Sequence, residues 1–535
     1  MNKTYEKIQN GLEKMSELKS ASLISGIVCA IPFVFEKTFF LSFIMYIPLF
    51  YLYASGEKCR KSFVKSILFG FGYYAVSYSF LCELYPLDFA GLTPVEAIGV
   101  IAFALSAIPL IHATLFTVSF VFCKKLTEKG GTLVKVLSFP CIVVFTEFLQ
   151  TLGPLAFPWS RVSIAQSAFL PFLQSASLFG SYFTAYTVLL INALIAYGIM
   201  NKSLRKRMLA LAFAVFAVNT AYGCIRLALH KDDGDIITAI ALQGNMSSSE
   251  KWTESTTETA EIYISLADEA ISLAKERKMA DSTVILMPET AIPTVIVENS
   301  KFQTLFSEYA DKNNISLAVG AFSIEENTSA NSVFMFDEHG KIHKHYNKRI
   351  RVPFGEYLPY RTLFTAIVPA LAEINMLSED LFEGKESLAF NTQVGVTTPV
   401  ICYESVFPEL CRESVNKGAE ILLVSTNDSW FGLSGALKHH LAASRMRAIE
   451  NNVPVIRAAN TGISAVINAD GSYAAVLEGD KRGFVLSEIN KGKGGTLYSK
   501  IGDVIIPLCF LLVLLAFFVH LSEVINIMID FVEKI

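Results

Sequence analysis

The most regular feature of the chain is a series of apolar runs within its first 226 residues. Seven runs follow one another closely, and an eighth stands alone near the C-terminus: 20–35, 38–54, 62–82, 96–123, 132–151, 178–200, 207–226 and 503–526. Each run is near or above the ~20 residues that an α-helix needs to cross ~30 Å of hydrocarbon. The pattern therefore predicts a multi-pass α-helical membrane domain with about eight spans.

The positive charges between these runs alternate along the chain. The connections after the second, fourth and sixth runs are rich in Lys and Arg, whereas the connections between them hold little positive charge. Because short cytoplasmic loops carry an excess of Lys and Arg, we expect a cytoplasmic N-terminus and an outer location for residues 227–502. The runs could instead be buried helices of a soluble protein. That alternative would not explain why connections rich in Lys and Arg alternate with connections that are poor in them.

Two segments near these runs do not fit the pattern of a simple membrane span: a polar N-terminal segment and a proline-containing apolar loop. Residues 1–19 carry four lysines without the short charged start and small-residue cleavage site of a signal peptide, so the first apolar run is expected to remain as a membrane helix. Residues 154–180 are too apolar for a solvated loop and too interrupted by proline for a clean span. We interpret them either as an interfacial segment on the outer leaflet or as a loop packed inside the bundle.

From Asp235 the periodicity changes to alternating strands and helices. The predicted strands are 236–242, 284–287, 316–322, 420–425 and 453–458, with helices over 255–277 and 434–451 and hairpin turns at 337–340 and 468–471. This alternation indicates a layered α/β domain. The expected domains are therefore 1–230 in the membrane with about seven helices, 231–500 as an extracytoplasmic catalytic domain and 501–535 as a C-terminal membrane helix.

One segment of the polar domain, 361–383, is apolar where a solvated loop would be expected. We expect it to form a mobile arm that touches the bilayer and gates the site.

The composition agrees with a membrane protein and argues against a nucleic acid partner, a metal site and a cofactor. Hydrophobic residues make up 52% of the 535 residues, and the mean hydropathy is +0.44. The net charge is −4 with no long basic block, which argues against nucleic acid as a partner. The nine cysteines form no CxxC pair and have no nearby histidine, so we expect no metal site, and nothing in the sequence calls for a cofactor.

A candidate nucleophile lies in the stretch 398–407. An apolar run ends at Ile401, and Ser405 is placed to cap a following helix towards Val415, so Cys402 is expected at a strand-to-helix elbow. Such an elbow projects a side chain into a cleft and leaves backbone N–H groups free for an oxyanion. The alternatives are a thiol that packs as a small buried hydrophobe, or a disulfide with Cys411.

Two further polar residues complete a possible catalytic set. The apolar strand at 284–287 ends on Glu289, and a polar stretch ends on Lys348. A carboxylate, an amine and a thiol in this order suit a general base, an oxyanion stabiliser and a nucleophile. The apolar strand before Glu289 makes its partial desolvation plausible.

The Glu–Lys–Cys order at these elbows resembles the nitrilase superfamily, and the surrounding residues resemble its membrane-embedded members, the apolipoprotein N-acyltransferase family. Six short motifs carry the second resemblance: Gln243-Gly-Asn245, Pro288-Glu289-Thr290, Pro353-Phe-Gly-Glu356, Cys402-Tyr-Glu404, Asn427-Asp-Ser-Trp-Phe-Gly432 and Arg457-Ala-Ala-Asn-Thr-Gly462. The chain departs from the family pattern after Lys348, where Arg349-Ile-Arg351 stands in place of the His and Leu that are common there.

The resemblance implies a fold and a set of roles. It implies an α-β-β-α sandwich beside the membrane helices, with Glu289, Lys348 and Cys402 as catalytic residues. It also implies that Glu356 positions Lys348 and that Glu404 supports the site. Aromatic residues would line the acyl or lipid path, or serve as plain interface anchors: Trp252, Tyr403, Trp430 and Phe431.

The function implied by the resemblance is acyl transfer at the bacterial inner membrane, with the catalytic domain on the periplasmic side. A phospholipid would donate the acyl chain, a Cys402 thioester would carry it, and the N-terminal amine of a diacylated apolipoprotein would receive it, the enzyme acting as a monomer. One alternative is a membrane-tethered amidase or nitrilase that hydrolyses a small amide. Another is a transporter or receptor with a degenerate nitrilase-like domain.

Overall fold

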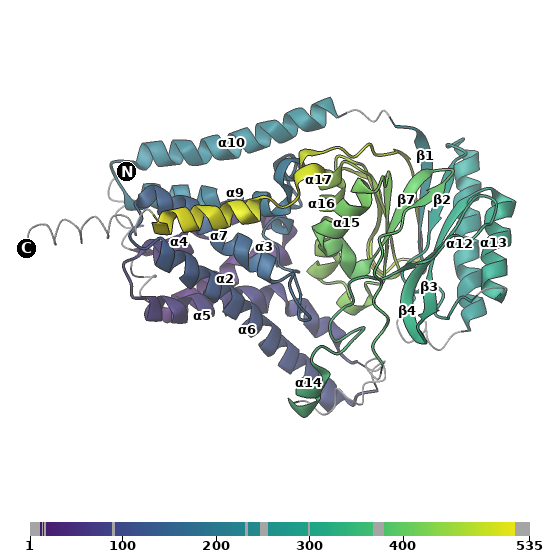
Figure 1. The fold of residues 1–535 in the computed structure, drawn as a ribbon, viewed down its shortest axis with the longest axis horizontal. Coiled ribbons are helices and arrows are strands. Elements are labelled where there is room, and N and C mark those ends of the chain that lie inside the picture. Colours follow the sequence, from purple (N-terminus) through teal and green to yellow (C-terminus); the bar gives the residue numbers. More distant parts are fainter. Residues whose placement is uncertain are drawn as a thin grey trace, which may run out of the picture.

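The structure is a computed structural model that describes residues 11–12, 14, 18–87, 91–230, 234–246, 255–297, 300–367 and 379–518. A bundle of helices occupies one end of the long axis, and a layered α/β domain occupies the other (Figure 1). This arrangement confirms the predicted class, a multi-pass helical membrane domain joined to a layered α/β domain.

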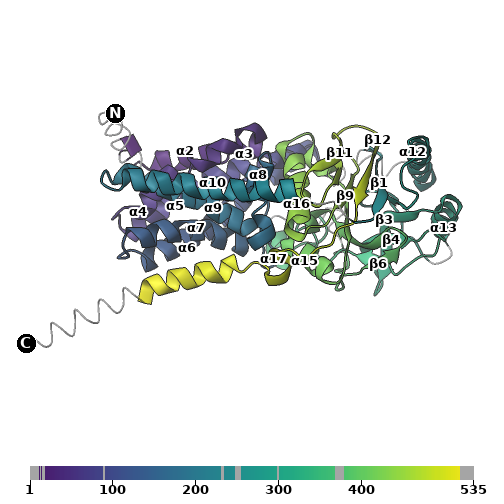
Figure 2. The same cartoon turned by 90° about the horizontal axis from the view of Figure 1, so that it is seen from above.

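The bundle is built from apolar helices joined by short 3₁₀ segments. In chain order they are α2 (Lys19–Cys29), α3 (Ile31–Val34), η1 (Glu36–Phe43), α4 (Ile47–Ala54), α5 (Cys59–Ser77), η2 (Ser79–Leu84), α6 (Pro94–Leu126), α7 (Thr132–Leu149), η4 (Ile164–Gln166), α8 (Leu170–Leu173), α9 (Ala176–Met200) and α10 (Arg205–Leu229). A last apolar helix, Ile505–Phe518, returns along the bundle (Figures 1 and 2).

Five of the described helices are long and apolar enough to cross a membrane: Glu36–Ala54, Pro94–Leu126, Thr132–Leu149, Ala176–Met200 and Arg205–Leu229. The apolar helices Lys19–Val34 and Ile505–Phe518 are shorter. A count of eight spans stays a prediction, and part of the eighth predicted run, 519–526, lies outside the described residues.

A local sequence signal explains where the long helix α6 begins. Thr93 and Glu96 form a reciprocal capping box around Pro94, which occupies the first helical position. At the other end, the Lys124 ammonium donates to the carbonyl oxygens of Leu52, Tyr53 and Ser55, which lie at the end of α4. One lysine therefore joins the ends of two helices.

The α/β domain contains two six-stranded sheets. The first has the order β12-β1-β2-β3-β4-β5, with β1 (Ile236–Gln243), β2 (Thr283–Leu286), β3 (Ser316–Glu325), β4 (Thr328–Phe336), β5 (Tyr346–Asn347) and β12 (Gly483–Asn490). The second has the order β11-β10-β9-β8-β7-β6, with β6 (Phe390–Thr392), β7 (Gly395–Ile401), β8 (Ile421–Thr426), β9 (Val455–Ala459), β10 (Ser464–Ile467) and β11 (Tyr473–Leu477).

The two sheets face each other between two layers of helices. Small and branched side chains such as Ala239, Leu286 and Leu423 fill the space between the sheets. Helices α12 (Thr256–Glu276) and α13 (Lys301–Asn313) cover the first sheet, and α15 (Pro408–Asn416) and α16 (Gly435–Asn451) cover the second (Figure 1). The result is the α-β-β-α sandwich that the family resemblance implies.

The predicted elements of this domain are confirmed to within a few residues. Parallel β1, β2 and β3, and parallel β7, β8 and β9, arise from the buried apolar runs of the sequence. The predicted turns at 337–340 and 468–471 both occur, closed by hydrogen bonds from Gly340 N to Asp337 O and from Gly471 N to Asn468 O.

The helical layer of α15 and α16 faces the membrane bundle (Figures 1 and 2). Helix α9 is broken at Gly180, where φ is 77°, and a Cβ at this position would lie 2.6 Å from the Tyr498 ring. The break frees the Ser181 N–H, which donates a 2.8 Å hydrogen bond to Glu450 at the end of α16. A glycine-dependent helix break thus becomes a contact between the two domains.

Much of the broken loop 154–180 lies at this interface rather than on the surface. Trp159, Arg161 and Gln166 are each buried, and the Arg445 side chain of α16 donates to the Ser167 carbonyl at 2.7 Å. The two interpretations given above were an interfacial segment and a loop packed inside the bundle. The structure instead packs much of the loop between the bundle and the α/β domain.

The apolar segment 361–383 is described only at its ends. It begins with α14 (Arg361–Ile367), whereas residues 368–378 lie outside the described residues. Phe364 packs against the start of α6, and Leu363 and Ile367 are each 56% exposed. That this segment touches the bilayer and gates the site stays a prediction.

Candidate active site

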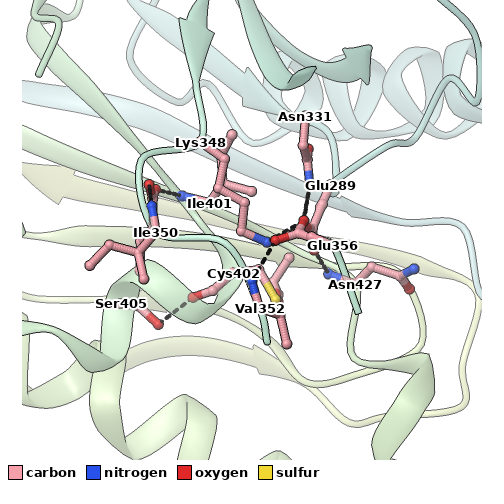
Figure 3. Close-up of polar contacts among 12 residues, drawn as sticks. Glu289, Asn331, Lys348, Ile350, Val352, Glu356, Ile401, Cys402, Ser405 and Asn427 are labelled. Carbon is pink, nitrogen blue, oxygen red and sulfur yellow. Dashed lines mark hydrogen bonds and ion pairs between the residues drawn. The ribbon is translucent and has the colours of Figure 1, made fainter. Parts of the chain in front are cut away.

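Glu289 follows β2 and its carboxylate is held by three donors. One oxygen accepts from the Lys348 ammonium at 2.9 Å and from the Asn331 amide at 2.7 Å, and the other accepts from the Asn427 N–H at 2.8 Å (Figure 3). Burial alone would raise the pKa of Glu289, but the positive charge of Lys348 and hydrogen bonds with Lys348, Asn331 and Cys402 together hold this pKa below its ordinary value. The group is therefore an ionised carboxylate at neutral pH.

Lys348 follows the short strand β5 and lies between two carboxylates. Its ammonium is 2.9 Å from an oxygen of Glu289 and 2.9 Å from an oxygen of Glu356 (Figure 3). Burial would lower the pKa of this amine, but the two carboxylates raise it well above its ordinary value. Lys348 is thus a fixed buried cation, as an oxyanion stabiliser requires.

Cys402 is the first residue after β7 and begins the 3₁₀ turn η7 (Cys402–Val406). Its φ is 52°, a left-handed conformation that non-glycine residues adopt only under constraint. The side chain is 8% exposed, and burial together with the nearby Glu289 charge raises the pKa of the thiol. At rest the site therefore holds a thiol beside a carboxylate that can accept its proton, and hydrogen bonding with Cys402 also lowers the pKa of Glu289.

One local prediction about this elbow is wrong. Ser405 does not cap a helix, because α15 begins only at Pro408 with Phe407 before it. The Ser405 hydroxyl instead donates a 2.8 Å hydrogen bond back to the Cys402 carbonyl. The tight turn η7 has taken the place of the first turn of the expected helix. The predicted alternative of a disulfide does not occur, since Cys402 and Cys411 are both free.

The two carboxylates expected to support the site act on different parts of it. Glu356 accepts from Lys348 with one oxygen and from the Val352 N–H with the other, at 2.8 Å, so it anchors the ammonium to a backbone loop. Glu404 accepts instead from the backbone N–H groups of Ile401 and Arg349. It therefore ties the end of β7 to the loop that follows Lys348.

The residues expected to line a lipid path are only partly brought together. Tyr403 is buried and its hydroxyl donates to the Ala156 carbonyl of the membrane domain at 2.8 Å. Phe431 packs against Trp159 at 5.0 Å, and Trp430 is half-buried in the 3₁₀ turn η8 (Ser429–Phe431). Trp252 lies outside the described residues.

Several residues of the site were not singled out from the sequence. Trp159 stacks on Tyr403 at 6.2 Å and so brings the membrane loop to the residue next to Cys402. Asn331 lies within β4 and bonds to both Glu289 and Glu356. Asn427 and Asp428 belong to a quoted motif, but their spacing gave no role, and Asn331 had no signal at all.

Two parts of the chain match models of known protein families. Residues 239–497 match the family model of the carbon-nitrogen hydrolases, and residues 25–194 match that of the apolipoprotein N-acyltransferase N-terminal domain. The fold and the Glu–Lys–Cys site therefore define a membrane protein with a nitrilase-like domain.

Individual relatives extend over nearly the whole chain. An apolipoprotein N-acyltransferase of Bradyrhizobium diazoefficiens is 30% identical over 453 residues, covering 82% of this chain and 81% of its own. One from Geobacter metallireducens is 28% identical over 501 residues, covering 91% and 92%. Among solved structures, Saccharomyces cerevisiae Nit3, a member of branch 10 of the nitrilase superfamily, covers 49% of this chain and 92% of its own at 20% identity and a TM-score of 0.36. The chain belongs to the apolipoprotein N-acyltransferase family, and it is a bacterial membrane enzyme, an N-acyltransferase.

Proposed function

We propose that the chain transfers a fatty acyl group from a membrane phospholipid to the N-terminal amine of the S-diacylglyceryl cysteine of apolipoproteins. The reaction is ping-pong, with the acyl chain held as a thioester on Cys402, and it completes lipoprotein maturation. The observation that carries the proposal is the buried Glu289–Lys348 pair, 2.9 Å apart, beside a thiol at a strained elbow. This set provides a base, a fixed cation and a nucleophile in one buried site.

In the first half-reaction Glu289 takes the thiol proton while the sulfur of Cys402 attacks an ester carbonyl of the phospholipid. Because the pKa of Glu289 is low and that of the thiol is raised, the proton moves only as the attack proceeds. Lys348 stabilises the tetrahedral oxyanion. The C–O bond of the ester then breaks, Glu289 returns the proton to the leaving alkoxide, and a lysophospholipid departs.

In the second half-reaction the N-terminal amine of the lipoprotein attacks the thioester. Glu289 takes a proton from the attacking nitrogen, Lys348 again stabilises the oxyanion, and the C–S bond breaks as the amide forms. Glu289 gives its proton to the departing sulfur. The Cys402 thiol and the Glu289 carboxylate are thereby restored, so no external proton donor or cofactor enters the balance.

The position of the site beside the bundle supports lipid substrates. Tyr403 reaches the membrane loop at Ala156, and Trp159 packs against it. Moving a sixteen-carbon chain into water would cost on the order of 12 kcal/mol at ~0.8 kcal/mol per CH₂. A site next to the membrane helices avoids this cost because lipids reach it sideways. Donor and acceptor then use the same path in turn, which favours a covalent carrier.

The proposed location is the inner membrane, with the α/β domain on the periplasmic side and the enzyme acting as a monomer. The alternating Lys and Arg connections support this orientation. A membrane-impermeant amine reagent applied to intact spheroplasts should label lysines within 235–500. Labelling that appears only after the membrane is broken would refute the orientation.

The mechanism is tested by incubating purified enzyme with labelled phospholipid and no acceptor, followed by gel detection of label that hydroxylamine removes. Cys402→Ala should form no adduct, and Glu289→Gln and Lys348→Ala should form little or none. Cys411→Ala is the matched control, since this second buried free thiol of the same domain should not be needed. Lipoprotein N-acylation by Cys402→Ala, or a requirement for both substrates together, would refute the thioester mechanism.

A further inference from the structure

An open pocket of about 440 Å³ lies between the end of helix α10 and the α/β domain. Its wall combines Ser177 of α9, Tyr222 and Arg226 of α10, Asn452 after α16 and the loop 494–497. Helix α10 runs along the outside of the bundle and ends beside the α/β domain (Figures 1 and 2). The pocket is therefore built by both domains at the place where they meet.

The end of α10 is held firmly at this pocket. A Cβ at Gly223 would lie 1.7 Å from the Pro171 carbonyl oxygen, so only glycine allows α10 to approach α8 this closely. The Asn219 amide adds a 2.9 Å hydrogen bond to the Phe172 carbonyl. Arg226 follows within one turn of this contact, and its position in the pocket wall is fixed by it.

The charge of Arg226 is not balanced by a carboxylate within the part of the chain that the structure describes. Its guanidinium donates to the side-chain oxygens of Gln174 and Asn452, which are both neutral amides. The acidic residue that acts on it through space, Asp470, accepts instead from the N–H and the hydroxyl of Ser472. These bonds use two of the five N–H groups of an arginine, so donors remain for an anion in the pocket.

Arg226 lies at the level of the lipid headgroups. It comes 19 residues after Arg207, at the start of the same helix, and this separation is a rise of about 28 Å, close to the ~30 Å of a hydrocarbon core. The last turns of α10 also present apolar side chains, since Ile225 is 58% exposed and Leu229 is 72% exposed. A lipid with its phosphate in the pocket could thus lay its acyl chains along α10.

The pocket is separate from the site of acyl transfer. His440 of α16 lies 3.0 Å from the Cys402 carbonyl, and Asn452 comes 12 residues further along that helix, a rise of about 18 Å. In a phospholipid the glycerol places the ester groups only a few bonds from the phosphate. A lipid whose phosphate contacts Arg226 therefore cannot present its ester to Cys402.

We propose that this pocket binds the phosphodiester of a net anionic phospholipid, in the leaflet next to the α/β domain, and that the bound lipid ties α10 to that domain. The planar guanidinium matches a pair of phosphate oxygens, and its single charge balances that of the phosphodiester. None of the described residues that line the pocket is Asp or Glu, so the ammonium of a zwitterionic headgroup finds no partner. Phosphatidylglycerol should therefore bind more tightly than phosphatidylcholine.

Thermal unfolding of delipidated Cys402→Ala enzyme in detergent tests this site. The protein is titrated with dioctanoyl phosphatidylglycerol, dioctanoyl phosphatidylcholine or inorganic phosphate. Phosphatidylglycerol should raise the unfolding midpoint saturably, phosphatidylcholine should need at least tenfold more lipid for the same rise, and inorganic phosphate should have no effect at these concentrations. The Cys402→Ala background forms no thioester, so the result does not depend on the proposed acyl transfer.

Two variants with matched controls locate the effect. Arg226→Gln should raise the concentration of phosphatidylglycerol for half-maximal stabilisation at least tenfold, whereas Arg207→Gln, at the other end of α10, should change it less than twofold. Leu229→Glu places a carboxylate at the pocket and should weaken binding tenfold or more. Leu229→Gln has nearly the same shape without the charge and should bind within twofold of the parent.

Equal stabilisation of Arg226→Gln and the parent by phosphatidylglycerol would overturn the inference. If Arg226→Gln does not fold, the two Leu229 variants decide, because this exposed side chain is not needed for packing. Equal binding by Leu229→Glu and Leu229→Gln would then overturn it. Stabilisation by inorganic phosphate as strong as that by phosphatidylglycerol would show a site for free phosphate, and equal stabilisation by phosphatidylcholine would show no preference for anionic lipid. Either result would refute the proposal.

Discussion

The ammonium of Lys348 lies 2.9 Å from Glu289 and both groups are almost completely buried. The proposed base and the proposed oxyanion stabiliser are therefore one ion pair, with Glu356 as a second carboxylate on the same amine. This ion pair fixes both the charge states and the positions of Glu289 and Lys348. Removing one partner should therefore change the stability of the fold and the rate of catalysis, and the two changes can be measured separately.

Replacing Lys348 by Met separates these effects. The variant leaves two buried carboxylates without a cation, which should destabilise the fold by about 3–5 kcal/mol and raise the pKa of Glu289. The triple variant Lys348→Met, Glu289→Gln, Glu356→Gln removes the uncompensated charges and should regain most of the stability without regaining acyl-enzyme formation. Thermal unfolding in detergent and the labelled-phospholipid assay measure the two quantities. Recovery of acylation in the triple variant would contradict the roles assigned to the pair.

Replacing Glu404 tests how the loop that follows Lys348 is held in place. Its carboxylate accepts from the N–H groups of Ile401 and Arg349 and from the Tyr346 hydroxyl, so an amide at this position places an NH₂ group against donors. Glu404→Gln should cost about 2 kcal/mol and slow adduct formation at least tenfold. Glu413→Gln alters two partly exposed ion pairs, with Arg349 and with Lys417, and should change stability by less than about 0.5 kcal/mol. Equal behaviour of the two variants would show that Glu404 does not hold the loop.

The raised pKa of Glu450, at the domain interface, should make the stability of the protein depend on pH. Burial raises its pKa to about 7 in spite of the nearby Arg447, against about 4.3 in the unfolded chain. The folded state then binds more protons between these values, so stability should fall by about 3 kcal/mol as the pH rises from 4.5 to 7. Glu450→Gln should remove this fall and match the parent at pH 4.5. Parallel unfolding curves of variant and parent across this range would exclude the shift.

Helix α14 supplies a matched pair for the proposed arm. Leu363 is exposed, whereas the neighbouring Phe364 packs edge-on against Phe354 at 5.0 Å. Leu363→Ser should therefore lower turnover of lipid substrate with little change in unfolding temperature, because it removes only a surface that would touch lipid. Phe364→Ser should lower the unfolding temperature. Full activity of Leu363→Ser on phospholipid in bilayers would argue against membrane contact here.

The sequence predicted those parts of the site that local pattern controls. Glu289 and Cys402 each follow a buried apolar strand, so periodicity could place each of them near the end of a strand. Periodicity could not bring them together, because β2 and β7 belong to different sheets. The role of Lys348 depended on family resemblance, because a lysine in a polar run carries no such signal.

Residues that depend on tertiary packing could not be predicted. His439 and His440 are adjacent on one helix and indistinguishable in sequence, yet one turns to Phe33 of the bundle and the other to the Cys402 carbonyl. Asn331 reaches the site only because β4 pairs with β3 in a particular register. The burial of Trp159 requires the two domains to be docked, which no local pattern contains.

The helical layer that covers the second sheet has a consequence for how this protein is made. Phe407 and Ala443 of that layer belong to the same buried cluster as Trp159 of the membrane loop. Cutting the chain before β1 would expose this surface to water and remove the Trp159 ring that stacks on Tyr403, the residue after Cys402. The α/β half should therefore not survive as a soluble fragment. During synthesis we expect this domain to complete its folding only against the inserted helices, so that membrane insertion would precede the proposed activity of Cys402.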